Sequence, residues 1–199
     1  MTNKGTGAGG SKTNIHGKAF EAKTEHLDGF TKKCIGYEKD NIVYLRQTEL
    51  KKYFRTMFKK EVIRYPDEAY LIRNGDKYTL KIIEKKSQKV EGSVIEKLNL
   101  GPFYKEEYEW CLGPQFKVEY AYCLSSFLKK KYLSDTLKSK FLREMNRRNE
   151  IIVLFGDDED YQERLNEFIY NESTLHSSVS PDSWSESLVD KKSPTLDIL

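Results

Sequence analysis

The chain has 199 residues, which is the usual length of one domain with a hydrophobic core of its own. Its net charge is only +3, so it is not basic throughout, although basic residues cluster locally and residues 157–160 are all acidic. Cys34, Cys111 and Cys123 are odd in number and far apart, which argues against a zinc site or a disulfide framework. No apolar run is long enough to span a bilayer, and residues 1–12 lack the apolar centre of an export signal. We therefore expect a cytoplasmic protein that is neither secreted nor attached to a membrane.

The composition divides the chain into three parts. Residues 1–14 are mostly Gly, Ser, Thr, Asn and Lys, which predicts a flexible arm. Residues 172–199 are rich in Ser, Thr, Asp and Pro with isolated apolar positions, which predicts a disordered tail. Residues 15–171 carry the periodic apolar patterns of a folded domain.

The first part of this domain is predicted to contain two helices and a small strand pair. A helix is expected from residue 15 or 16 to about 27, and strands at 34–37 and 41–45 are expected to flank a polar turn at 38–40. Thr48 is expected to cap a second helix at 49–60, where apolar residues recur at helical spacing.

The second half alternates helices and strands. Gly101-Pro102 and Gly113-Pro114 are expected to end helices, and Ser134 is expected to cap one. The expected elements are a helix at 90–98, a short helix at 106–112, a strand at 116–124, helices at 125–132 and 134–148, a buried strand at 150–155 and a helix at 160–170. The acidic run would stabilise the N-terminus of the last helix through the helix dipole, a role that we favour over a second metal site. The pattern predicts an α/β domain with a mixed central β-sheet flanked by helices.

A β-hairpin is predicted between Pro66 and Gln88, because β-forming residues lie on both sides of residues 74–76 (Asn-Gly-Asp). Two registers are open. If Gly75 and Asp76 form the centre of the turn, Asp67 lies directly opposite Glu84, whereas a turn centred on residues 74–75 places Asp67 opposite Ile82 with Glu84 diagonal to it. In both registers the two carboxylates meet on one face of the hairpin.

Lys86 projects from the same face as Glu84, because side chains alternate along a strand. Like charges that face each other across two strands repel unless a cation lies between them. A hard divalent cation such as Mg²⁺ would be held by such carboxylates, and a neighbouring lysine could orient the attacking water. The cluster therefore predicts a phosphodiester hydrolysis site. The alternative is that these residues form an ordinary solvated face of the hairpin. The apolar run 80–83, which leads directly into the cluster, argues against this alternative.

Pro66-Asp67 followed by Glu84-Lys85-Lys86 resembles the signature of the PD-(D/E)XK nucleases, and Gln88 extends it to the form E-x-K-x-Q. The resemblance implies a restriction-endonuclease-like core with Mg²⁺, or alternatively Mn²⁺, bound by Asp67, Glu84 and the main-chain carbonyl of Lys85. It also implies that Lys86 activates the water and that Gln88 orients Lys86 or a phosphate. Many members carry a further acidic residue on the preceding helix, which would here be Glu21.

Within that superfamily the chain most resembles a small type II restriction endonuclease. The resemblance implies cleavage of double-stranded DNA at a short specific sequence by a homodimer, with a cognate DNA methyltransferase that protects the same site. A repair, recombination or RNA-cleaving nuclease of the same superfamily is an alternative. A non-catalytic nucleic-acid-binding protein is another, but two carboxylates would repel the phosphates that such a protein binds.

Overall fold

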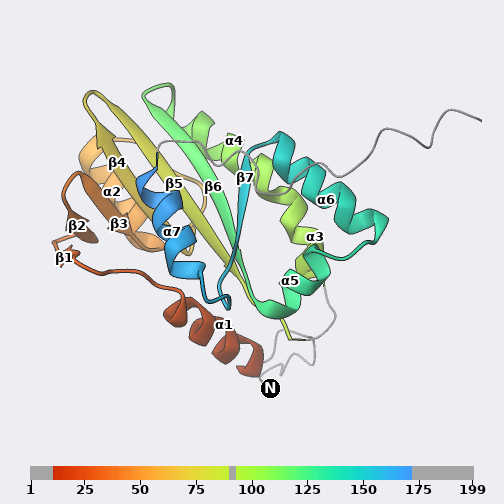
Figure 1. The fold of residues 1–199 in the computed structure, drawn as a ribbon. Helices are drawn as coiled ribbons and strands as arrows, with labels where there is room; N and C mark the ends of the chain where they lie inside the picture. The colour runs from red at the N-terminus through yellow and green to blue at the C-terminus, as the bar shows by residue number, and fades with distance from the viewer. Residues whose placement is uncertain (1–10, 90–92, 172–199) are drawn as a thin grey trace, which may run out of the picture.

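The computed structural model describes residues 11–89 and 93–171, and of residues 11–16 it describes the backbone alone. This part of the chain is built on a seven-stranded sheet whose strands lie side by side in sequence order (Figure 1). The strands are β1 (Thr31–Lys32), β2 (Tyr37–Lys39), β3 (Ile42–Leu45), β4 (Glu68–Asn74), β5 (Lys77–Lys86), β6 (Phe116–Leu124) and β7 (Ile151–Phe155). Neighbours from β1 to β5 are antiparallel, and β5, β6 and β7 are parallel. The predicted α/β class with a mixed central sheet is confirmed.

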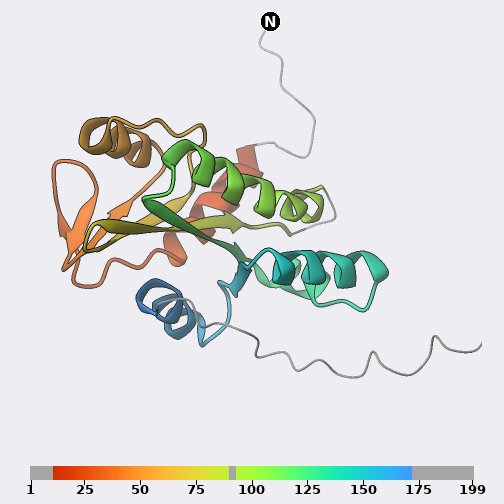
Figure 2. The same ribbon diagram turned by 90° about the horizontal axis from the view of Figure 1, so that it is seen from above.

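Helices cover both faces of the sheet. They are α1 (Ser11–Lys23), α2 (Thr48–Phe58), α3 (Val94–Lys97), the 3-10 helix η1 (Leu98–Leu100), α4 (Gly101–Leu112), α5 (Ser126–Tyr132), α6 (Leu137–Arg148) and α7 (Tyr161–Tyr170). One core joins the sheet to α2, α4, α5 and α6, and a second core joins the opposite face to α1 and α7. Figure 2 shows α2 and α4 on one side of the sheet and α7 on the other.

The β4–β5 hairpin adopts the first of the two predicted registers. Ala69 lies opposite Ile82 and Asn74 opposite Lys77, so Gly75 and Asp76 are the two central residues of the turn. Gly75 has a φ of 64°, which suits the first central position of a type II′ turn, where glycine is favoured. This register extends the pairing so that Asp67, which directly precedes β4, faces Glu84.

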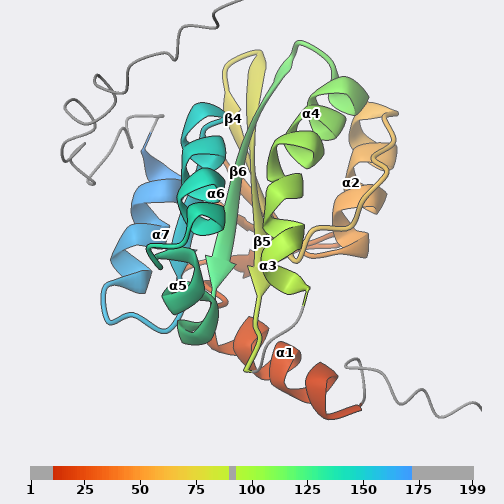
Figure 3. The same cartoon turned by 90° about the vertical axis from the view of Figure 1, so that its right-hand side faces the viewer.

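Because β5 and β6 are parallel, crossover connections place their carboxyl ends at the same end of the sheet. Parallel neighbours need such connections, and here they pass through α3, η1 and α4 between β5 and β6, and through α5 and α6 between β6 and β7. Figure 3 shows the end of β5 beside α1. The segment from Glu84 to Lys86 therefore lies at the end of the sheet that is next to α1.

Several predicted elements are confirmed. The strand at 116–124 is β6, the strand at 150–155 is β7 without its first residue, and the last helix is α7. The expected burial of β7 is met only in part, because β7 lies at the edge of the sheet and its residues 152, 153 and 155 are partly exposed. The inward residues predicted for α7, namely Tyr161, Leu165, Phe168 and Ile169, are all buried. The predicted helix at 90–98 falls partly on residues outside the described ranges, and so do most of the predicted N-terminal arm and the whole predicted tail.

Other predicted boundaries are wrong. The first helix begins earlier, at Ser11, and the turn between β2 and β3 lies at residues 40–41, where Asp40 has a φ of 53°. Thr48 is the first residue of α2 rather than its cap. Thr136 caps α6 instead of Ser134, because its side chain accepts a hydrogen bond from the Ser139 amide.

Gly101-Pro102 begins a helix rather than ending one. Proline suits the first turn of a helix, where its missing N–H has no intrahelical partner. Gly101 has an ordinary helical φ of −53°, but a Cβ there would lie 2.9 Å from the ring of Tyr122. The glycine therefore allows the close approach of α4 to β6 rather than a turn.

Candidate metal-binding and catalytic site

Asp67, Glu84 and Lys86 converge on one face of the hairpin, as the sequence predicts. The backbone amide of Lys85 donates a hydrogen bond to Asp67 Oδ2 over 2.7 Å, which holds the Asp67 carboxylate at the end of β5. Lys86 Nζ lies 2.5 Å from Glu84 Oε1, and both side chains are partly buried. The two acids and the lysine therefore form one electrostatic unit.

The electrostatic balance of this unit favours an added cation. Burial raises the pKa of Glu84, and the negative charge of Asp67 raises it further, while the ion pair with Lys86 lowers it. The pKa of Glu21 is also raised, by burial first and then by Asp67, with Lys85 and Lys86 acting in the opposite direction. Glu21 therefore lies within electrostatic reach of Asp67, as expected for an acidic residue on the preceding helix.

The side chain of Lys85 lies on the opposite face of the sheet, in a buried ion pair that the sequence analysis missed. Its Nζ is 2.5 Å from Glu68 Oε1, and the two side chains are 1% and 4% exposed. The same Nζ donates a hydrogen bond to the main-chain oxygen of Glu21 over 2.9 Å, and Tyr44 donates one to Glu68 Oε1 over 2.9 Å. Lys85 thus ties α1, which carries Glu21, to the strand that carries Glu84. The alternation of side chains along β5 would have placed Lys85 on this face.

Gln88 lies just beyond the end of β5, beside the start of α5. Its backbone amide donates a hydrogen bond to Ser125 Oγ over 3.3 Å, and its carbonyl accepts one from the same hydroxyl over 3.4 Å. These contacts fix the main chain of Gln88. Its role in orienting Lys86 or a phosphate, and that of the Lys85 carbonyl as a metal ligand, remain predictions.

Buried tyrosines surround Glu84, and the sequence analysis did not identify them. Burial raises the pKa values of Tyr108, Tyr120 and Tyr122, and the charge of Glu84 raises each of them further. All three hydroxyl groups are therefore neutral at physiological pH. Tyr108 comes from α4 and the other two from β6. The sequence alone does not reveal that they meet, because this depends on how α4 packs on the sheet.

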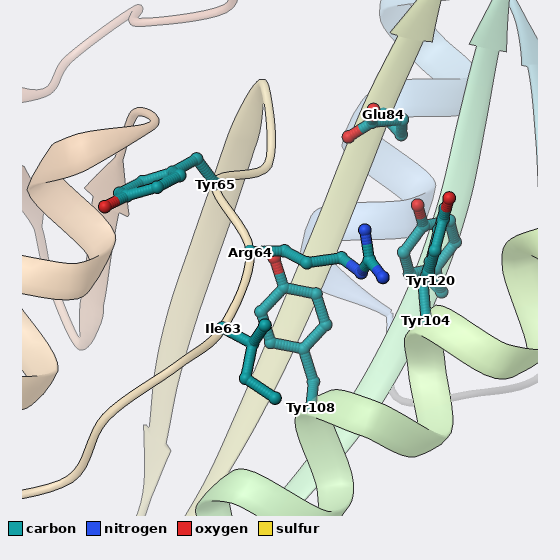
Figure 4. A pocket seen from close by; sticks show the side chains of 7 residues that line it. All are labelled: Ile63, Arg64, Tyr65, Glu84, Tyr104, Tyr108 and Tyr120. Atoms are coloured by element: carbon teal, nitrogen blue, oxygen red, sulfur yellow. The ribbon is translucent and has the colours of Figure 1, made fainter.

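Glu84 lines a pocket of about 330 Å³ (Figure 4). The other walls of this pocket come from the loop between α2 and β4, from α4 and from β6. The lining residues are Ile63, Arg64, Tyr65, Glu84, Tyr104, Tyr108 and Tyr120. The pocket therefore gives access to Glu84 from the face of the sheet that this side chain occupies.

The donor set fits a hard cation. Within residues 11–89 and 93–171, no group of three or more His, Cys, Asp or Glu residues is arranged to hold a metal ion. Mg²⁺ typically takes only one or two protein carboxylates and completes its shell with waters and phosphate oxygens. Asp67 and Glu84 can supply these carboxylates, and an all-oxygen set suits Mg²⁺ or Mn²⁺ better than zinc.

The acidic run after β7 contacts neighbouring helices. Asp157 Oδ1 lies 2.9 Å from Lys23 Nζ on α1, and Oδ2 accepts a hydrogen bond from the Ser126 amide of α5 over 2.7 Å. Asp158 pairs with Lys129 on α5 over 2.5 Å. These contacts fasten α1 and α5 to the segment that precedes α7. The predicted stabilisation of α7 through its helix dipole stays a prediction.

No protein-family model, curated protein or solved structure matches this chain. Among the helices of the described ranges, none combines the length and the apolar character that crossing a bilayer requires.

Proposed function

We propose that this protein is a Mg²⁺-dependent nuclease with a restriction-endonuclease-like core that hydrolyses phosphodiester bonds of double-stranded DNA at a short specific sequence, as type II restriction endonucleases do. The observation that supports it most is the convergence of Asp67, Glu84 and Lys86 at the end of a hairpin whose register sets the two carboxylates against each other. Cutting both strands of a symmetric site implies a homodimer, and protection of host DNA implies a cognate methyltransferase.

The proposed roles follow from the contacts of each side chain. Asp67 and Glu84 would hold Mg²⁺ or Mn²⁺, which when bound neutralises charge on the phosphate and lowers the pKa of a bound water. Lys86 is kept at the acids by its ion pair with Glu84, so its ammonium group can orient the attacking water or contact a phosphate oxygen. Glu21 would accept a hydrogen bond from a water beside Asp67, and Lys85 would position α1 for that purpose.

A non-catalytic nucleic-acid-binding protein accounts less well for these residues. The charge of Asp67 raises the pKa of the partly buried Glu84, and both carboxylates repel phosphate, so a binding protein would gain from losing them. A repair, recombination or RNA-cleaving nuclease would use the same site and would differ only in its preferred substrate.

The test is a cleavage assay with purified protein. Unmodified phage and plasmid DNA are incubated with Mg²⁺ or with EDTA, using the wild type, Glu84→Ala and the control Glu163→Gln, which alters an exposed carboxylate on α7. We expect discrete fragments that require Mg²⁺, disappear with Glu84→Ala and persist with Glu163→Gln. The absence of cleavage of duplex, branched and single-stranded DNA and of RNA would refute the catalytic proposal.

A further inference from the structure

The pocket at Glu84 is lined by the planar guanidinium group of Arg64, whose positive charge is balanced by a carboxylate. Arg64 Nε lies 2.7 Å from Glu107 Oε1, and the guanidinium carbon lies 4.1 Å from the centre of the Tyr104 ring. Figure 4 shows the Arg64 side chain reaching across the pocket toward Tyr104 and Tyr120. The ion pair fixes the orientation of the guanidinium plane, and the side chain remains 41% exposed. Arg64 therefore offers a flat stacking surface more than an unbalanced positive charge.

The remaining lining favours a flat, neutral group with polar edges. Tyr108 and Tyr120 are 3% and 2% exposed, and their hydroxyl groups point toward the Glu84 end of the pocket in Figure 4. Neutral hydroxyl groups can donate or accept hydrogen bonds at the edge of a ligand ring. Arg64, Glu107 and Glu84 together carry no net positive charge, so the pocket is unsuited to a free phosphate. A purely apolar ligand would offer no hydrogen bond to the hydroxyl groups of Tyr108 and Tyr120.

The size of the pocket allows one nucleotide and excludes a duplex. Its volume of about 330 Å³ lies at the lower end of the range for small-ligand sites, which begins near 300 Å³. Bases that have left the double helix are commonly held by stacking on aromatic rings or on arginine guanidinium planes. The stack of Arg64 on Tyr104 provides such a surface in the pocket that the proposed metal ligand Glu84 also lines.

We propose that this pocket receives the base of one unpaired DNA nucleotide, stacked on the Arg64–Tyr104 pair, next to the phosphate that is cut. The proposal rests on the proposed nuclease function, because Glu84 places the pocket beside the scissile bond. It implies that the substrate carries an unpaired nucleotide or that the enzyme turns one out of the duplex. A duplex that contains a bulged nucleotide should then bind more tightly than the same duplex fully paired.

The test compares binding by fluorescence anisotropy of a labelled duplex and the same duplex with one bulged thymidine. All proteins carry Asp67→Asn, so that binding is measured without cleavage. Since stacking of one base typically changes affinity about 5- to 150-fold, we expect a bulge preference in that range. Tyr104→Leu should abolish the preference and Tyr104→Phe should keep it. Trp110→Ala, which alters an 81% exposed residue on the same helix, should also keep it.

Equal affinity for the two duplexes, or a preference that survives Tyr104→Leu, would overturn the pocket proposal. Tyr104→Phe retains the ring, so its comparison with Tyr104→Leu separates loss of stacking from loss of folding. The nuclease proposal is tested separately by cleavage with the wild type. Cleavage without a bulge preference would refute the pocket alone, and a bulge preference without cleavage would refute the nuclease alone.

Discussion

Replacing Lys85 by methionine tests the buried ion pair that lies beneath the site. In the wild type, Lys85 Nζ contacts Glu68 Oε1 over 2.5 Å and the main-chain oxygen of Glu21 over 2.9 Å. The Glu68 side chain is 4% exposed, and its Oε2 atom has no hydrogen-bond partner among the described residues. Lys85→Met would leave this carboxylate with Tyr44 as its remaining donor.

Breaking a buried pair by removing one partner typically costs about 3–5 kcal/mol, because the other charge stays buried without compensation. For a domain of this size that loss lowers the Tm by about 6–20 °C. The effect depends on pH. Burial already raises the pKa of Glu68 and Lys85 opposes that shift, so the variant raises the pKa further. A carboxyl group with a raised folded-state pKa favours folding at low pH and loses that contribution as pH rises, so the deficit should grow with pH.

Urea denaturation at about pH 5 and pH 8 measures these free energies of unfolding. The double variant Lys85→Met/Glu68→Leu is the control, because replacing both charges by apolar side chains should restore most of the lost stability. A single variant within about 1 kcal/mol of the wild type at pH 8 would contradict the reasoning. So would a double variant as unstable as the single one.

Three further predictions concern the site and one glycine. Because burial and Asp67 raise the pKa of Glu84, protons should compete with Mg²⁺, so the rise in Tm on adding Mg²⁺ should be larger at about pH 8 than at pH 5, and a pH-independent rise would contradict this. Lys86→Met should lower the single-turnover cleavage rate by about 10²- to 10⁴-fold, whereas a loss below tenfold would exclude a role in proton transfer or water orientation. Gly36 and Gly75 both have positive φ, 73° and 64°, but only at Gly36 would a Cβ overlap a backbone carbonyl. Gly36→Ala should therefore cost at least about 1 kcal/mol more than Gly75→Ala in urea denaturation, and equal losses would refute the overlap.

The hairpin and its acid and lysine cluster could be predicted from the sequence because they depend on local patterns. The Asn-Gly-Asp turn and the alternation along the strands place Glu84 and Lys86 on one face in either register. The choice of register could not be made, because both turn centres contain Gly75. The structure resolves it through the turn geometry, which places Gly75 at the first central position.

Features that depend on contacts between distant parts of the chain could not be predicted. Gly101-Pro102 has the composition of a helix end, although proline also suits the first turn of a helix, and the close approach of Tyr122 that explains Gly101 is visible only in the structure. The tyrosines around Glu84 come from α4 and β6, which a long crossover brings together. Glu68 and Lys85 belong to neighbouring strands, but their burial requires α1 and α7 to cover that face of the sheet.

The proposed function depends on the binding of a divalent cation by Asp67 and Glu84. Mn²⁺ can be titrated into the protein while electron paramagnetic resonance follows the free ion. We expect saturable binding by the wild type and by Glu163→Gln, and loss of that binding in the double variant Asp67→Asn/Glu84→Gln. Saturable binding that survives the double replacement, or none in the wild type, would contradict it.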